Sequence, residues 1–264
     1  MIKSIGIFDS GIGGLTVAKE VARLLPYEDI VYFGDTARVP YGIKSKSTII
    51  KFSTENILFL LKQDVKLIVI ACNTSSSVAL SVLKRHFKIP IIGVISPGIK
   101  EAIYATRNKR IGVIATKATI NSQAYQRQIK RIDSKIKVFN QACPLLVPLV
   151  EEGWLNQKST YDIASYYLKP LKKAKIDTLI LGCTHYPLLK KVLRNILGGS
   201  VRLIDSAQQV AREAKEVLAS DGMLNKKRNP RYLFYVSDEL QQFKKVAKNF
   251  LGREIKNLRK VNHV

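Results

Sequence analysis

The sequence predicts an α/β protein of two pseudo-symmetric domains, each a mainly parallel sheet flanked by helices, with an active site in the cleft between them. Short runs rich in Ile and Val alternate with longer amphipathic segments, and this alternation begins a second time near Arg110. Runs buried on both faces and separated by helices are typical of parallel strands joined by crossover helices. The chain of 264 residues is long enough to bury two such cores.

In the first unit, four apolar runs are predicted to be strands: SIGIFDS (4–10), DIVYFGD (29–35), KLIVIAC (66–72) and IPIIGVI (89–95). Apolar residues at helical spacing predict helices over about 14–25 and 47–63, and a third that runs from the end of KLIVIAC to about Phe87.

In the second unit, the predicted strands are RIGVIATKATI (110–120), KIKVFNQA (135–142), DTLILGCTH (177–185) and VRLIDS (201–206). A further strand, RYLFYVS (231–237), is followed by a predicted helix from Asp238 to Leu251 with Ser237 as its N-cap. We expect this C-terminal segment to return to the first domain, which then comprises 1–97 and 207–264, while 98–206 form the second domain.

The two units resemble each other beyond their periodicity. IGIFDS (5–10) aligns with IGVIAT (111–116), and LIVIACNT (67–74) aligns with TLILGCTH (178–185), so each half has a strand that ends in Cys and two polar residues. Ligands of open α/β sheets bind outside the carboxyl ends of the strands. We therefore expect Cys72 and Cys183 on opposite walls of one cleft. The repeat is imperfect, because Asp9 corresponds to Ala115.

The net charge of +24 raises the question of a nucleic-acid partner. The lysines are scattered, however, and no recognition helix, zinc finger or aromatic-flanked basic ribbon is present, so we interpret the charge as solvated and expect no nucleic-acid partner. No signal peptide or membrane span is predicted, since Asp9 and Gly11 interrupt the N-terminus and NTSSS breaks the longest uncharged stretch. Three cysteines without an export signal favour a cytoplasmic protein.

Several chemistries are open to the two strand-end cysteines. They could be core residues, as we expect for Cys143, or zinc ligands with His185, although no close-spaced ligand pair exists. A Cys-His hydrolase would leave the second cysteine unexplained. Two thiols across a cleft suit the removal of a proton from one face of a carbon and its return to the other, because a thiol pKa of about 8.5 is within reach of neutral pH. Such a pair needs no cofactor or metal.

Two loops could complete the site. FDSGIGGLTV (8–17) does not match GxGxxG, because residue 16 is Thr, but it offers backbone N–H groups and Ser10 to a carboxylate at a helix N-terminus. Asp9 could orient a thiol, pair with an ammonium group or hold a turn. DTARVPYG (35–42) could present the Tyr41 and Gly42 backbone to the same cleft. We expect His86 and His263 to lie at the surface, and Glu151 and Glu152, each taken alone, to be solvated.

Together, IGIFDSGIGGLTV, YFGDTARVPYG, VIACNTSSSVAL, GVISPG, PLVEEG and LILGCTHYPLL resemble the bacterial glutamate racemases, in order from residue 5 to about 190. The resemblance implies cofactor-independent interconversion of L- and D-glutamate, which supplies D-glutamate for peptidoglycan synthesis. Such enzymes are often homodimers. Two alternatives stay open, a racemase for another acidic amino acid and a secondary role in modulating DNA gyrase, which is associated with some members.

The resemblance also implies site roles. Cys72 would take the α-proton from D-glutamate and Cys183 from L-glutamate, with Asp9 and His185 as their assistants. The implied substrate-binding residues are Asp9, Ser10, Tyr41, Gly42, Asn73, Thr74, Thr116, Thr119, Glu152, Thr184 and His185. Ala115 stands where the family leads us to expect Gly.

Overall fold

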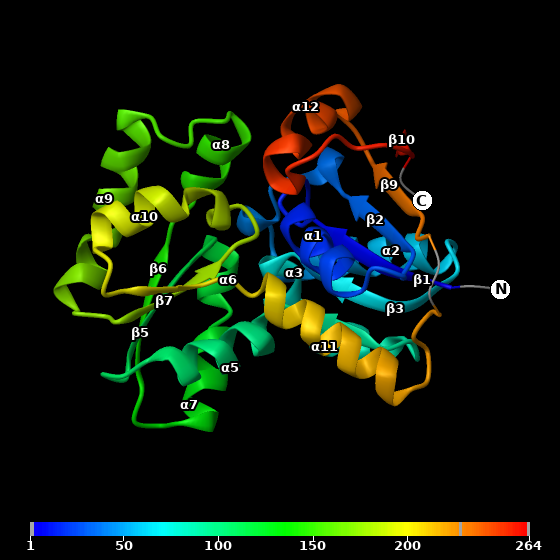
Figure 1. The fold of residues 1–264 in the computed structure, drawn as a ribbon. Coiled ribbons are helices and arrows are strands. Elements are labelled where there is room, and N and C mark those ends of the chain that lie inside the picture. Colours follow the sequence, from blue (N-terminus) through cyan, green and yellow to red (C-terminus); the bar gives the residue numbers. More distant parts are fainter. Residues whose placement is uncertain (1–2, 227–228, 263–264) are drawn as a thin grey trace.

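The computed structural model describes residues 3–226 and 229–262, which form two parallel sheets covered by helices (Figure 1). The first sheet has the order β10-β9-β2-β1-β3-β4 and the second the order β6-β5-β7-β8. The strands of the first are β1 (Ser4–Asp9), β2 (Ile30–Gly34), β3 (Val65–Ile70), β4 (Ile91–Gly93), β9 (Tyr232–Val236) and β10 (Leu258–Lys260). Those of the second are β5 (Arg110–Ala115), β6 (Lys137–Ala142), β7 (Thr178–Gly182) and β8 (Arg202–Ile204).

The internal repeat is confirmed by the strand order. The consecutive strands β2-β1-β3-β4 of the first sheet correspond one for one to β6-β5-β7-β8 of the second. In each half, the opening strand pairs in parallel with the strand that precedes a cysteine, β1 with β3 and β5 with β7. The same local sequence pattern therefore places each cysteine at the same position of its own sheet.

Helices connect and cover the strands in both halves (Figure 1). In chain order they are α1 (Leu15–Leu24), α2 (Lys46–Leu61), α3 (Asn73–Val78), α4 (Leu80–His86), α5 (Ile95–Ala105), α6 (Lys117–Asn121), α7 (Ala124–Ile132), α8 (Leu146–Glu151), α9 (Lys158–Lys173), α10 (Lys190–Leu197), α11 (Ala207–Ser220) and α12 (Leu240–Leu251). Three short 3₁₀ turns are η1 (Thr36–Arg38), η2 (Tyr41–Ile43) and η3 (Tyr186–Leu189).

Apolar strand residues form the cores on which the site is built. In β1 the side chains of Ile5, Ile7 and Phe8 are fully buried, as expected for a central strand covered on both faces. Helix α1 buries its apolar side, including Leu15 and Val21, against α11 and α12. The C-terminal strands extend the first sheet, because β9 pairs with β2.

Three local predictions are wrong. The strand predicted over 110–120 ends at Ala115, and the residues that follow form α6, with Thr116 as its N-cap. The helix predicted after KLIVIAC is two helices, α3 and α4, which meet at Ala79. The last helix begins at Leu240, after Glu239 with φ 54°, so Ser237 is not its N-cap. The Ser237 hydroxyl instead donates to Asp35 Oδ1 at 3.1 Å. The Ser237 side chain therefore bonds to a carboxylate about two hundred residues away in the chain, and not to a backbone N–H of the helix that follows it.

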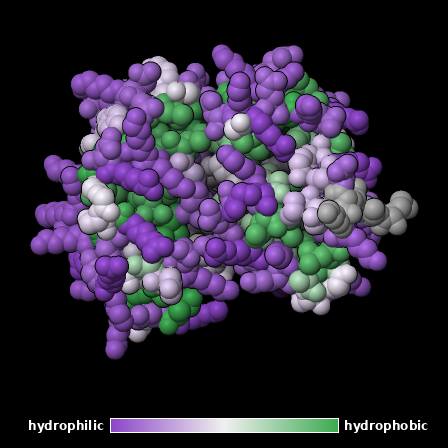
Figure 2. Space-filling view, viewed as in Figure 1, coloured by the Kyte–Doolittle hydropathy of each residue, from purple (hydrophilic) through white to green (hydrophobic). Residues whose placement is uncertain are grey.

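The face of the molecule drawn in Figure 2 is mainly hydrophilic, with apolar residues in separate areas between the hydrophilic ones. His86 is exposed, as predicted, whereas His263 lies outside the described residues. Within the described part of the chain, no helix is long and apolar enough to cross a membrane.

Candidate active site

Cys72 and Cys183 line one small cavity between the two sheets. Cys72 follows β3 and Cys183 follows β7, and both are largely buried, with 5% and 7% of their surface exposed. The cavity is lined by Ser10, Val39, Pro40, Tyr41, Gly42, Cys72, Asn73, Thr74, Thr116, Val147, Cys183, Thr184 and His185. Its volume of about 30 Å³ holds a water molecule or two, so an amino acid enters only if the walls separate.

The Cys72 thiol sits among neutral donors and one carboxylate. Its S–H donates to Ser10 Oγ at 3.6 Å, and its sulfur accepts the Ser75 N–H at 3.5 Å as the N-cap of α3. Burial and the nearby charge of Asp9 raise the pKa of the Cys72 thiol to about 11. Cys72 is therefore a protonated thiol at neutral pH, ready to act as an acid.

Cys183 sits beside a histidine that is itself held by a carboxylate. His185 Nδ1 lies 3.8 Å from Cys183 Sγ, and His185 Nε2 lies 3.0 Å from Glu151 Oε1. Burial opposes the charged ring, but the hydrogen bonds to Cys183 and Glu151 outweigh it and raise the pKa of His185 to about 10. The ring thus carries its proton at neutral pH, next to the sulfur.

Asp9 joins the two halves behind the cavity. Its Oδ2 accepts the Gly11 N–H at 3.1 Å, and its Oδ1 accepts the Thr184 hydroxyl at 3.4 Å. Burial raises the pKa of Asp9, while His185 and the backbone amides around it oppose the rise. Asp9 does not line the cavity. It contacts the lining residue Thr184 through a hydrogen bond, and its negative charge raises the pKa of the Cys72 thiol.

Hydroxyl groups from both halves meet at one wall. Thr74 Oγ1 lies 2.9 Å from Thr116 Oγ1 and 3.3 Å from Thr119 Oγ1. Thr116 is also the N-cap of α6, where it accepts the Thr119 N–H at 3.4 Å. Nearby, Tyr125 Oη donates to Asn73 Oδ1 at 2.6 Å. These hydroxyls and amides form a neutral donor set of the kind that binds a carboxylate.

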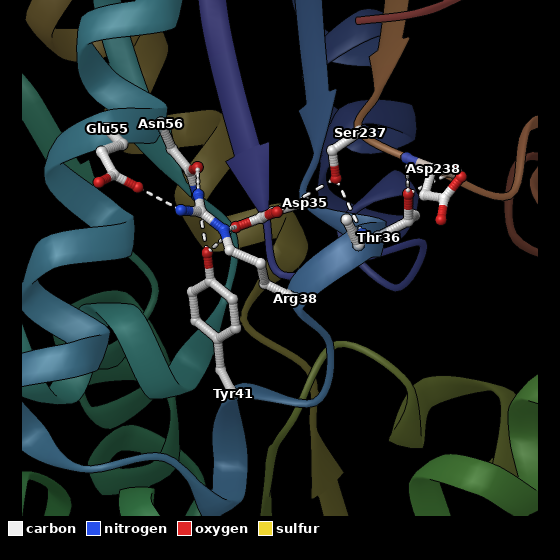
Figure 3. Close-up of polar contacts among 9 residues, drawn as sticks. Asp35, Thr36, Arg38, Tyr41, Glu55, Asn56, Ser237 and Asp238 are labelled. Carbon is white, nitrogen blue, oxygen red and sulfur yellow. Dashed lines mark hydrogen bonds and ion pairs between the residues drawn. The ribbon is translucent and has the colours of Figure 1, made fainter. Parts of the chain in front are cut away.

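The loop that carries Tyr41 and Gly42 is anchored by the polar network in Figure 3. The Tyr41 hydroxyl donates to Asp35 Oδ2 and accepts from Asn56 Nδ2, so it points away from the cavity. Asp35 also accepts from Arg38 Nε at 2.7 Å. At Gly42, a Cβ atom would lie 2.6 Å from Thr116 Cβ, so only glycine fits against the opposite wall. Tyr41 and Gly42 both line the cavity, and a contact of their backbone with a substrate stays a prediction.

The structure brings together most of the residues singled out from the sequence. Asp9 and Thr119 lie one contact behind the cavity wall, whereas Glu152 is exposed and lines a separate groove. Sequence reasoning treated Glu151 as solvated and passed over Tyr125, Asp35 and Asn56. The acidic pair after PLV was a signal for Glu151, but only the packing of α8 against η3 shows which carboxylate reaches His185. Among the described residues, no group of three His, Cys, Asp or Glu side chains could hold a metal ion.

Comparisons with known proteins agree with this geometry. Residues 11–214 match the Asp/Glu/Hydantoin racemase family. Over 261 residues the chain is 48% identical to the glutamate racemase of Geobacter metallireducens, covering 98% of this chain and 97% of that protein. The crystal structure of a glutamate racemase isoform from Bacillus anthracis superposes with a TM-score of 0.95 at 40% identity, covering 98% of this chain and 97% of that one. The Francisella tularensis glutamate racemase in complex with D-glutamate gives a TM-score of 0.93 at 42% identity, covering 99% and 98%.

Proposed function

Because this chain belongs to the Asp/Glu/Hydantoin racemase family, we propose that it interconverts L-glutamate and D-glutamate by moving the α-proton between Cys72 and Cys183. The observation that carries this proposal is the placement of two free, buried thiols at equivalent strand ends on opposite sides of one cavity. The choice of glutamate is supported by relatives that carry this name over nearly the whole chain and by one that holds D-glutamate.

The reaction needs one sulfur ionised and the other protonated. When L-glutamate binds, the Cys183 thiolate takes the α-proton, and the electron pair of the broken C–H bond stays on the α-carbon. The Cys72 thiol then gives its proton to the opposite face, which forms the new C–H bond and leaves a Cys72 thiolate. D-glutamate reacts by the same steps in reverse. The raised pKa of Cys72 fits the role of proton donor in the first direction.

A carbanion next to a carboxylate is the unfavourable intermediate, so donors must be aimed at that carboxylate before reaction. Ser10, Asn73, Thr74, Thr116 and Thr184 supply neutral hydroxyls and amides around the cavity. The cavity of about 30 Å³ leaves little room for water beside a substrate, and excluding water strengthens these hydrogen bonds. Tyr41 and Gly42 would contribute backbone groups to substrate binding, and Thr119 supports the Thr74 hydroxyl. The charged groups beside the two thiols are His185, next to Cys183, and Asp9, near Cys72. For Glu152, a substrate contact stays a prediction.

Isotope exchange tests the proposal directly. We expect Cys72→Ser and Cys183→Ser each to abolish racemisation, while Cys143→Ala, which changes a buried thiol outside the cavity, keeps it. In D₂O, deuterium should enter the α-position of both enantiomers without added pyridoxal phosphate or metal. Turnover undiminished in either serine variant would overturn the two-thiol mechanism. Running L-aspartate beside L-glutamate tests the alternative of a different acidic substrate.

The wider setting is also a proposal. Three free thiols support a reducing, cytoplasmic compartment, where the enzyme would supply D-glutamate for peptidoglycan synthesis.

Domain boundaries at 97/98 and 206/207 are supported by the pairing of β9 with β2, because this pairing returns the C-terminal segment to the first sheet. A homodimer is tested by sedimentation, and binding to DNA or gyrase by titration at increasing salt, where purely electrostatic attachment is lost.

A further inference from the structure

We infer that the Ser75 hydroxyl is a positioning group for Cys72, which donates a hydrogen bond to the sulfur when it becomes a thiolate. The inference rests on the proposed function, because it gives Ser75 a part in the same proton transfer. No role for this hydroxyl follows from the sequence motifs, which single out Asn73 and Thr74 but not the residues after them.

The first observation is that Ser75 Oγ is buried without a partner. The side chain is fully buried, and within the described residues its oxygen makes no hydrogen bond. The next two hydroxyls of α3 are both satisfied, Ser76 by Ile70 O at 3.0 Å and Ser77 by Thr74 O at 2.9 Å. A buried hydroxyl without a partner is costly and uncommon in proteins, so it calls for an explanation.

The second observation is where this residue lies. The Ser75 N–H donates to Cys72 Sγ at 3.5 Å, which holds Ser75 against the sulfur. In the protonated state the Cys72 S–H donates to Ser10 Oγ at 3.6 Å. A thiol has little capacity to accept another hydrogen bond, whereas a thiolate is a full negative charge that accepts several. The Ser75 hydroxyl thus makes no hydrogen bond of normal geometry in the resting state, yet it lies near enough to the sulfur to lower the pKa of the Cys72 thiol, which places it to serve the ionised state.

The electrostatics around the sulfur agree. Burial is the largest influence on Cys72 and raises the pKa of its thiol, and Asp9 adds to the rise. The Ser75 amide, the Ser10 hydroxyl and the Ser75 hydroxyl each lower that pKa. They favour the thiolate without bringing in a positive charge.

The half of the site that holds Cys183 supports its sulfur in a different way. The residue three positions after Cys183 is Tyr186, whose hydroxyl donates to Cys143 O at 2.9 Å and is not available to a thiolate. There His185 contacts the sulfur. The two copies of the repeat therefore support their thiols by different means, neutral hydroxyls for Cys72 and an imidazole for Cys183.

The test is the titration of Cys72 itself. In the full chain carrying Cys143→Ala and Cys183→Ala, the rate of alkylation by iodoacetamide against pH reports the thiolate of Cys72 alone. We expect Ser75→Ala to move this titration to higher pH, so that the thiolate fraction at a fixed pH falls roughly two- to tenfold. Ser75→Thr, which keeps the hydroxyl, should restore it. With all cysteines present, Ser75→Ala should lower kcat with little change in KM.

Ser77→Ala is the matched control, because it removes a hydroxyl from the same helix that bonds to Thr74 O instead of facing the sulfur. An unchanged Cys72 titration in a folded Ser75→Ala protein, or an equal shift in Ser77→Ala, would overturn the inference. The alkylation readout does not require turnover. Failure here is therefore distinct from failure of the proposed function, which would appear as an active Cys72→Ser enzyme.

Discussion

Glu151 Oε1 lies 3.0 Å from Nε2 of His185, and through this contact a carboxylate on α8 reaches a ring that faces Cys183 on its other side. The carboxylate fixes which way the ring points and keeps it protonated, since hydrogen bonding to the charged form favours that form. The contact therefore connects the side of the cavity that holds Cys183 to the packing of α8 against η3 and α9.

Replacing Glu151 should weaken this arrangement. We expect Glu151→Gln to lower the pKa of His185 below about 10 and to reduce kcat by roughly 10-fold or more, as is usual for groups that support a general acid or base. Glu216→Gln, at an exposed residue of α11 that does not line the cavity, should leave kcat unchanged. NMR titration of the His185 ring and steady-state kinetics of both variants measure this. Equal losses of activity in the two variants would contradict it.

Much of this site follows from the sequence, because it depends on residues that end strands. Cys72 and Cys183 can be paired from the sequence alone, since the repeat assigns them equivalent positions and parallel strands end at the same edge of a sheet. Ser237 shows where this reasoning stops. A local N-cap was a reasonable prediction, but the hydroxyl bonds to Asp35, a partner that only the pairing of β9 with β2 brings near.

The same limit applies to Glu151 and Tyr125. Both were absent from the predicted site because each contacts it across a packing interface that no periodicity reveals, Glu151 through η3 and Tyr125 through the approach of α7 to α3. The resemblance to a family identified the residues on strand ends and loops. It could not show which side chains from other elements hold them.

Protonation of His185 should make stability depend on pH. The folded pKa of about 10 lies above the ordinary value of 6.5, so between these values the folded protein binds the proton more tightly than the unfolded chain. This contribution to stability is fully present below pH 6.5 and is lost as pH rises through about 10. We expect the stability difference between wild type and His185→Asn, measured by urea unfolding, to shrink as pH rises across this window. A difference that is constant with pH would show that His185 is not the group responsible.

A methyl group at residue 13 should disable the site while the fold survives. A Cβ on Gly13 would lie 2.6 Å from His185 Nδ1 and would also clash with Thr184 Oγ1, which pushes apart the two walls at the cavity. Overpacking of this kind costs about 1–3 kcal/mol, too little to unfold most domains. We expect Gly13→Ala to lose most activity with a normal circular dichroism spectrum. Gly199→Ala, where a Cβ meets nothing within 4 Å, is the control and should be fully active.

The anchor of the Tyr41 loop gives a last prediction, on stability. Asp35 is fully buried, and Arg38 pairs with it at 2.7 Å with only 16% of its side chain exposed (Figure 3). Replacing Arg38 removes the positive charge that pairs with the buried Asp35 carboxylate, so we expect Arg38→Met to lower the free energy of unfolding by about 3 kcal/mol.

Because the cost arises from the charge left behind, neutralising Asp35 as well should recover part of it. We expect the double variant Arg38→Met/Asp35→Asn to unfold at a higher urea concentration than Arg38→Met alone. Lys158→Met, which breaks the exposed Lys158–Asp162 pair, serves as the surface control and should leave the unfolding midpoint unchanged. A double variant less stable than the single one would mean that Arg38 acts through its contacts with Glu55 and Asn56, and not by balancing the buried carboxylate.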